Sequence, residues 1–446
     1  MRRIVVVMGA GAVAVAAAAV AQTAQPAGSQ AAAAQAEAPF DARQAVAEVR
    51  RLIAENYVLP ERRATIDAAL AESLAAGRYD VDTPQALAER INADLERAGK
   101  DKHLNISFDP AQAAMLRSGG SDGGPDEAQF ERLAAARNHG LTEMKVLDGN
   151  IRYLAVDGFM WAGAKSAAAY DDAMRFLKGG DAAIIDIRRN GGGSPHAVQY
   201  LISHFMEPDR HIVTFHMRGD ENVDTLSTLK DLPAGRMVGK PLYVLASGRS
   251  ASAAEEFAGH IAGFKVGELI GETTAGAGFR NDLYPIPGGL VLSVSVGRAV
   301  LASTGKDWEA VGIAPTLAVA PEKALDVAHG RAARRLAATA TGRDKALLEG
   351  LAAVLAAKAD PVAPALPLAA YAGRFGERQV TVEDGKLMFQ RDGGPKMRLL
   401  AVGPNLFAFA DGDPLTRVRY EVAGTAAPAF ELIRGDGSRV RAARSE

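Results

Sequence analysis

The chain has 446 residues, of which 48% are hydrophobic and 23% are charged, a composition typical of a soluble globular protein with enough material for a large core. Its formal net charge of -2 excludes the strongly basic surface that nucleic-acid binding requires. The absence of cysteine excludes disulfides, thiolate-bound zinc, iron–sulfur clusters and a cysteine nucleophile. Any nucleophile in this protein must therefore be an oxygen or a nitrogen.

The N-terminal residues predict export. A short basic region, Met1-Arg2-Arg3, precedes an apolar run, and Ala19-Val20-Ala21 is typical of a signal-peptide cleavage site. Residues 1–21 are therefore predicted to be a signal peptide that is removed as the protein reaches the periplasm or the medium, the alternative being a weak membrane anchor. Residues 22–40, rich in Ala, Gln and Pro, are predicted to form a disordered tether. No later segment predicts stable membrane insertion.

Residues 41–110 are predicted to form an N-terminal helical domain. Apolar residues recur at helical spacing in three segments, 45–57, 65–76 and 83–98. Asp80 and Thr83 are the predicted helix caps. The unit ends in residues 104–108, whose alternation of apolar and polar residues predicts a strand.

Residues 126–320 predict an α/β core, because short β-rich segments alternate there with helical ones. The predicted strands are 151–156, 183–187, 211–217, 242–246 and 290–296, and the predicted helices are 126–138, 164–177, 195–205 and 252–261. Residues 321–360 are predicted to be helical. After a proline-rich linker, residues 368–446 show short alternating strands with Gly-Asp turns, which predicts a small antiparallel β-domain.

Two turns that follow predicted strands contain residues suited to acyl transfer. The first, Asn190-Gly191-Gly192-Gly193, exposes backbone N–H groups and allows a ligand to approach closely, although a plain tight turn explains it equally well. The second ends at Ser252, at the start of a predicted helix whose dipole would stabilise developing negative charge. By position alone, helix capping is the simpler role for Ser250 or Ser252.

Four motifs, in a fixed order, together carry a family resemblance. They are Asp-x-Arg-x-Asn-x-Gly-Gly at 186–193, Ser-Ala-Ser-Ala-Ala-Glu at 250–255, Gly-Glu-Thr-Thr-Ala-Gly at 271–276 and Trp-Glu-Ala-Val-Gly-Ile-Ala-Pro at 308–315. They resemble the tail-specific (C-terminal-processing) serine peptidases, and most of all the branch of interphotoreceptor retinoid-binding protein and tricorn-like members without a PDZ domain. The resemblance implies a crotonase-like α/β spiral core and a peptidase that acts on peptides or unfolded proteins without a cofactor.

The resemblance also implies how the reacting carbonyl is held. Ser252 matches the family's nucleophile. The backbone N–H groups of Ala253 and of Gly192 or Gly193 match the oxyanion hole. Asp186 and Arg188 are expected to pair and to hold the glycine turn rather than to act on substrate.

The lysine base of the processing peptidases is absent, because Ala277 stands in its place. His103 matches the histidine of the tricorn-like branch and is the candidate general base, with Glu309 supporting it in a Ser-His-Glu arrangement. His196, which follows the glycine turn, is the rival base.

The missing lysine also supports an alternative function. The chain would then be a catalytically inactive protein that binds a retinoid- or lipid-like apolar ligand, as the retinoid-binding branch implies. Hydrolysis of an ester or lactone by the same residues is a third possibility. A metal site is not predicted, since the sequence contains neither His-Glu-x-x-His nor a calcium-loop pattern.

Overall fold

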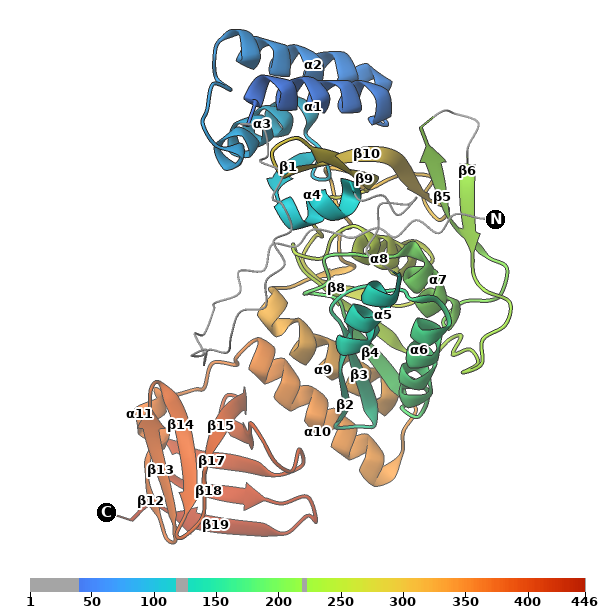
Figure 1. The fold of residues 1–446 in the computed structure, drawn as a ribbon. Coiled ribbons are helices and arrows are strands. Elements are labelled where there is room, and N and C mark those ends of the chain that lie inside the picture. The colour runs from blue at the N-terminus through green and yellow to red at the C-terminus, as the bar shows by residue number, and fades with distance from the viewer. Residues whose placement is uncertain (1–39, 118–126, 219–222, 446) are drawn as a thin grey trace, which may run out of the picture.

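The computed structural model describes residues 40–117, 127–218 and 223–445. The predicted signal peptide and, apart from Phe40, the predicted tether lie outside these residues. Figure 1 shows a helical unit at one end, an α/β core in the middle and an antiparallel sheet at the other end. Among the described helices, none is long and apolar enough to cross a membrane.

Three helices form the N-terminal unit, as the apolar spacing predicts: α1 (Ala42–Asn56), α2 (Pro60–Ala75) and α3 (Pro84–Gly99). Asp41 begins α1, because its carboxylate accepts hydrogen bonds from the first turn of the helix. Thr83 caps α3 as predicted, whereas Asp80 lies in the loop before it and caps neither helix. The apolar faces of the helices pack on a strand hairpin of the core.

That hairpin belongs to an antiparallel sheet with the strand order β1-β10-β5-β6, in which β9 also pairs with β10. The strands are β1 (Asn105–Phe108), β10 (Leu290–Leu301), β5 (His211–Met217), β6 (Val223–Ser227) and β9 (Phe279–Ile286), and α4 (Pro110–Arg117) follows β1. Asn105 pairs with Ser293. The end of the helical unit is thereby fixed against the core.

The central sheet has the order β11-β8-β7-β4-β3-β2, parallel except for the edge strand β2. Its strands are β11 (Leu317–Ala318), β8 (Glu268–Gly271), β7 (Leu242–Ala246), β4 (Ala182–Asp186), β3 (Ile151–Val156) and β2 (Leu141–Leu147), preceded by α5 (Glu127–Ala136) and a short 3-10 helix, Asn138–Gly140. Every residue of β4 and β7 is buried, as expected for strands that are covered on both faces.

Two layers of helices cover this sheet. On one face α6 (Gly163–Lys178), α7 (Pro195–Ser203) and α8 (Ala253–Gly263) pack on one set of alternating strand residues. On the other face the alanine-rich α9 (Ala324–Ala337) and α10 (Gly342–Ala359) pack on the other set, after a 3-10 turn at Pro321–Lys323. Because β4 and β7 are parallel neighbours, the glycine turn that follows β4 and the serine turn that follows β7 meet at one edge of the sheet.

The C-terminal residues form an eight-stranded antiparallel sheet in which each strand pairs with the next along the chain. After the short helix α11 (Leu368–Tyr371) come β12 (Gly373–Phe375), β13 (Arg378–Glu383), β14 (Lys386–Arg391), β15 (Lys396–Gly403), β16 (Leu406–Phe409), β17 (Arg417–Ala423), β18 (Ala426–Ile433) and β19 (Arg439–Ala443). This sheet has its own aromatic core and meets the rest of the protein through α10.

Candidate active site

The glycine turn packs directly against Ser252. Gly192 has a φ of 113°, and a Cβ at that position would lie 2.8 Å from the Ser252 Cβ. Gly193 has a φ of 135°, and a Cβ there would lie 2.3 Å from the carbonyl oxygen of Phe159. The Phe159 backbone holds the turn on both sides, donating to Gly192 and accepting from Ser194. Only glycine permits this close approach.

Ser252 precedes the first turn of α8 with φ 55° and ψ -119°, a conformation that a residue with a side chain rarely adopts. Its backbone N–H donates to Glu255 Oε2 at 2.9 Å, which stabilises the unusual backbone. Ser250, the neighbouring candidate, is fully buried and donates its hydroxyl to the carbonyl of Ile187 at 2.8 Å. Ser250 therefore has a structural role, and Ser252 faces the pocket.

The two turns together supply two N–H donors beside Ser252. Gly192 N–H is already engaged, because it donates to Asn190 Oδ1 at 2.8 Å. In the described part of the chain, the N–H groups of Gly193 and Ala253 have no hydrogen-bond partner. Of the donors expected from the sequence, Gly193 and Ala253 are therefore the pair able to stabilise an oxyanion, and Gly192 provides the close packing.

A small pocket, open to solvent, lies beside Ser252, Gly193 and Ala253. Apolar side chains supply much of its wall: Pro195, Phe215, Phe279, Ala299 and Trp308. Glu256 and Arg280 add opposite charges to the lining. The pocket is suited to an apolar side chain of a substrate whose carbonyl lies against Ser252.

Glu255 is a residue of the site that the sequence suggests only as a complement to the helix dipole. It is completely buried and accepts four hydrogen bonds. The donors are the Ser252 N–H, the Thr274 hydroxyl at 2.6 Å, the Gly276 N–H at 2.6 Å and the Ala277 N–H at 2.8 Å. One carboxylate thus joins the serine turn to the loop that carries Ala277 in place of lysine.

His103 and Glu309 lie together, with Asp101 as a third member that the sequence does not single out. A ligand atom from each of the three lies within 4.8 Å of the others. Burial lowers the pKa of His103, and the neighbouring Asp101 opposes this shift. Burial and the negative charge of Asp101 raise the pKa of Glu309 to about 7, although backbone N–H groups of Gly278 and Phe279 bind its Oε2.

No hydrogen bond joins the Ser252 hydroxyl to a histidine within the described ranges. The rival base His196 lies 3.5 Å from Gln199 Oε1, and the buried His260 lies 3.4 Å from Glu256. His103 is linked to the core through its carbonyl, which accepts from Ser293 Oγ. The structure therefore brings the His103 and Glu309 side chains together, but leaves both unbonded to the serine.

Residues 150–319 match Peptidase family S41, and residues 40–133 match the N-terminal domain of Peptidase_S41 in eukaryotic IRBP. The two matches together span more than half of the chain. This chain belongs to peptidase family S41. The family resemblance deduced from the four motifs is thereby confirmed.

A curated relative of this S41 chain is the carboxy-terminal processing protease CtpB of Bacillus subtilis (strain 168), 27% identical over 180 residues, or 40% of this chain and 36% of CtpB. The chain thus spans about a third of that relative's length. Two solved structures match this chain at low sequence identity. The photosystem II D1 C-terminal processing protease is 17% identical, with a TM-score of 0.43, over 64% of this chain and 94% of its own. Mature CPAF is 13% identical, with a TM-score of 0.45, over 70% of this chain and 98% of its own.

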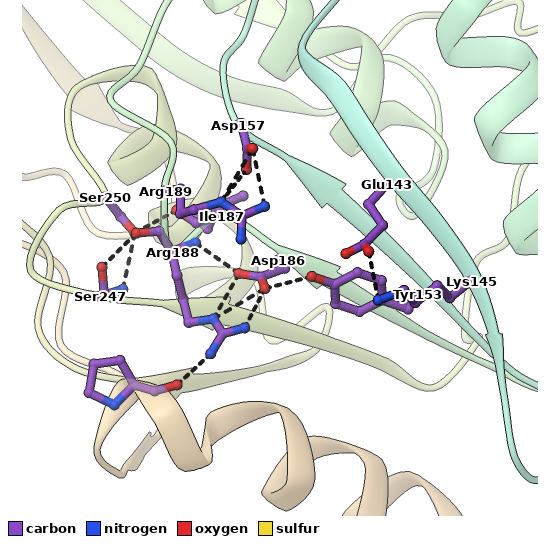
Figure 2. Close-up of polar contacts among 11 residues, drawn as sticks. Glu143, Lys145, Tyr153, Asp157, Asp186, Ile187, Arg188, Arg189, Ser247 and Ser250 are labelled. Atoms are coloured by element: carbon purple, nitrogen blue, oxygen red, sulfur yellow. Dashed lines mark hydrogen bonds and ion pairs between the residues drawn. The ribbon is translucent and has the colours of Figure 1, made fainter. Parts of the chain in front are cut away.

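The first S41 motif holds the glycine turn through a buried ion pair (Figure 2). Asp186, 3% exposed at the end of β4, binds the Arg188 guanidinium at 2.6 Å and accepts from the Tyr153 hydroxyl at 2.8 Å. Burial acts to raise the pKa of Asp186, but the hydrogen bonds and charge of Arg188 outweigh it and hold this pKa below its ordinary value. The pairing expected from the sequence is present.

Asp186→Asn is expected to lower the free energy of unfolding by about 3 kcal/mol at neutral pH, because Arg188 loses its buried partner. The pKa of Asp186 is lower in the folded protein than in the unfolded chain. The ionised Asp186 therefore stabilises the fold fully at any pH above its unfolded pKa of about 4, and this contribution is lost as the pH falls through the lower pKa of the folded protein. The melting temperatures of the wild-type protein and Asp186→Asn should therefore differ most at pH 7 and converge as the pH is lowered. The matched control is Asp172→Asn, at an exposed ion pair, which should have little effect at any pH.

Proposed function

We propose that this S41 chain is a serine peptidase that hydrolyses peptide bonds. Ser252 is the nucleophile, His103 the general base and Glu309 the group that supports His103, while the N–H groups of Gly193 and Ala253 form the oxyanion hole. One observation carries the proposal: a serine at a helix N-terminus, in a strained backbone conformation, lies beside two N–H donors that have no partner in the described part of the chain.

The chemistry follows from these positions. Ser252 Oγ attacks the substrate carbonyl and its proton passes to His103, which is neutral at physiological pH because burial lowers its pKa. The negative charge that develops on the carbonyl oxygen is stabilised by Gly193 and Ala253. Protonated His103 then donates its proton to the leaving amine. The turn of residues 101–103 must first close toward Ser252, as occurs when bound substrate tightens a site.

Further features of the protein are part of the same proposal. The signal-like N-terminus supports export to the periplasm or the medium. The parallel strands with helices on both faces support a crotonase-like spiral core at residues 126–320, flanked by the helical unit at 41–110 and the β-domain at 368–446. Peptides or unfolded proteins are the proposed substrates, bound as an added strand beside the apolar pocket.

A fluorophosphonate probe tests the assignment of nucleophile and base. The wild-type protein should be labelled at Ser252, as located by mass spectrometry of the digested product. His103→Ala should slow the labelling by about 10²- to 10⁴-fold, whereas His196→Ala should change it little, because His196 lies against Gln199. Slow labelling in His196→Ala alone would reassign the base. If the folded wild-type protein is neither labelled nor able to cleave any peptide, the peptidase proposal is wrong and the alternative of an apolar-ligand binding protein stands. That alternative does not explain the two N–H donors beside Ser252.

A further inference from the structure

Asp101, His103 and Glu309 form a buried cluster that contains two carboxylates and no basic partner except the imidazole itself. Asp101 and His103 lie in the turn before β1, and Glu309 lies in the loop after β10. Neither carboxylate forms an ion pair with a lysine or arginine of the described residues. The amino group of Lys102, between the two N-terminal members, binds the Ala275 carbonyl instead.

One side of each carboxylate is fixed by the backbone. Asp101 Oδ1 accepts from the N–H of His103 at 2.9 Å and from that of Leu104 at 3.3 Å. Glu309 Oε2 accepts from the N–H groups of Gly278 at 2.6 Å and Phe279 at 3.1 Å. The positions of both side chains are therefore set by bonds that do not use their second oxygen atoms.

The other atoms have no partner. Asp101 Oδ2, His103 Nδ1 and Glu309 Oε1 are each buried without a hydrogen bond, and Asp101 as a whole is only 6% exposed. Burial raises the pKa of the nearby Tyr57 hydroxyl, and the charge and hydrogen bonding of Asp101 add to this shift. Unpaired buried carboxylates are strongly unfavourable, so a positive charge at the centre of this cluster, or a proton on one of its carboxylates, would stabilise it.

We propose that Asp101, His103 and Glu309 bind a divalent transition-metal ion, with Zn²⁺ as the ion that suits them best. Imidazole nitrogen combined with carboxylate oxygen is a zinc donor set, whereas calcium and magnesium take oxygen alone. Ligand atoms around tetrahedral zinc lie about 3.4 Å apart, so a set within 4.8 Å needs up to about 1.4 Å of contraction. Three protein ligands leave a fourth position for water.

Bound zinc would inhibit the peptidase. This inhibition rests on the proposed function, whereas the binding of zinc does not. Neutral imidazole has one nitrogen with a lone pair and one that carries a proton. The metal takes the lone pair, whichever nitrogen is used, and leaves an N–H that cannot accept the proton of Ser252. The same residues would therefore serve as catalytic base or as metal site, but not as both at once.

Direct binding is measured on full-length protein carrying Ser252→Ala and freed of metal with EDTA, so that the result does not depend on catalysis. Calorimetric titration with Zn²⁺ should show one metal ion bound tightly per protein chain. Titration with Co²⁺ should give the visible absorption spectrum of a site with few ligands. Asp101→Asn and Glu309→Gln each keep an oxygen for the backbone bonds and should weaken binding at least about 10-fold.

Matched controls are Asp82→Asn and His216→Ala, exposed residues of the same types, which should leave the tight binding unchanged. Absence of tight binding, or tight binding that persists in both carboxamide variants, would overturn the metal site. In wild-type protein, Zn²⁺ should block fluorophosphonate labelling over the range in which it binds, and EDTA should restore it. Zinc that binds without slowing the labelling would overturn the inhibition and the role of His103 as base, while the metal site itself would stand.

Discussion

Ser252→Ala is expected to reduce the kcat/KM for a peptide substrate by at least about 10³-fold and to abolish fluorophosphonate labelling, because no other described residue that lines the pocket carries a hydroxyl. The fold should persist, since alanine keeps the backbone N–H through which residue 252 binds the Glu255 carboxylate. Steady-state hydrolysis and a thermal melt on the same preparation separate the two effects.

Ser250→Ala is the matched control for this substitution. Its hydroxyl donates to Ile187 and accepts from the Ser247 N–H, so its removal should lower the melting temperature and leave Ser252 labelled. Unchanged peptide hydrolysis in Ser252→Ala, or loss of labelling in folded Ser250→Ala alone, would contradict the assignment of the nucleophile.

Glu255→Ala is expected to lower the free energy of unfolding by about 3–5 kcal/mol, because the substitution leaves four buried donors without an acceptor. Activity should fall as well, since the carboxylate holds the strained Ser252 backbone through its N–H. Glu255 is thus a positioning residue. Denaturant unfolding gives the stability, and the labelling rate well below the melting temperature gives the effect on Ser252.

Glu255→Gln separates shape from charge. The amide keeps one acceptor oxygen, which can serve Ser252 and Ala277, but turns an NH₂ group toward the Gly276 N–H. Its stability and labelling rate should therefore lie between those of wild type and Glu255→Ala. Glu256→Gln is the neighbouring control for stability, because Glu256 has a single long contact with His260 at 3.4 Å. Equal destabilisation in both glutamine variants would contradict the role assigned to Glu255.

Local patterns account for most of the helices and strands. Apolar spacing predicts α1 to α3, and alternation predicts β1, because both patterns arise from which face of one segment is buried. Ser252 is assigned as the proposed nucleophile from the family resemblance of its motif, because position alone favours helix capping.

The remaining parts of the site depend on contacts between distant segments. Nothing around Glu255 indicates that Thr274, Gly276 and Ala277 will surround it. Gly192 and Gly193 are equivalent in the sequence, and only the bond from Gly192 to the Asn190 side chain distinguishes them. The family resemblance places Glu309 beside His103, but nothing in the sequence singles out Asp101 as the third member of their cluster.

The pairing of β1 with β10 has a consequence for the order in which the protein is made. The bond from Ser293 to the His103 carbonyl joins residues 190 positions apart, and Ser252 lies between them in the sequence. The proposed nucleophile is therefore synthesised before the strand that anchors the proposed base. Under the proposed mechanism, the chain acquires peptidase activity only when Glu309 has joined the folded core.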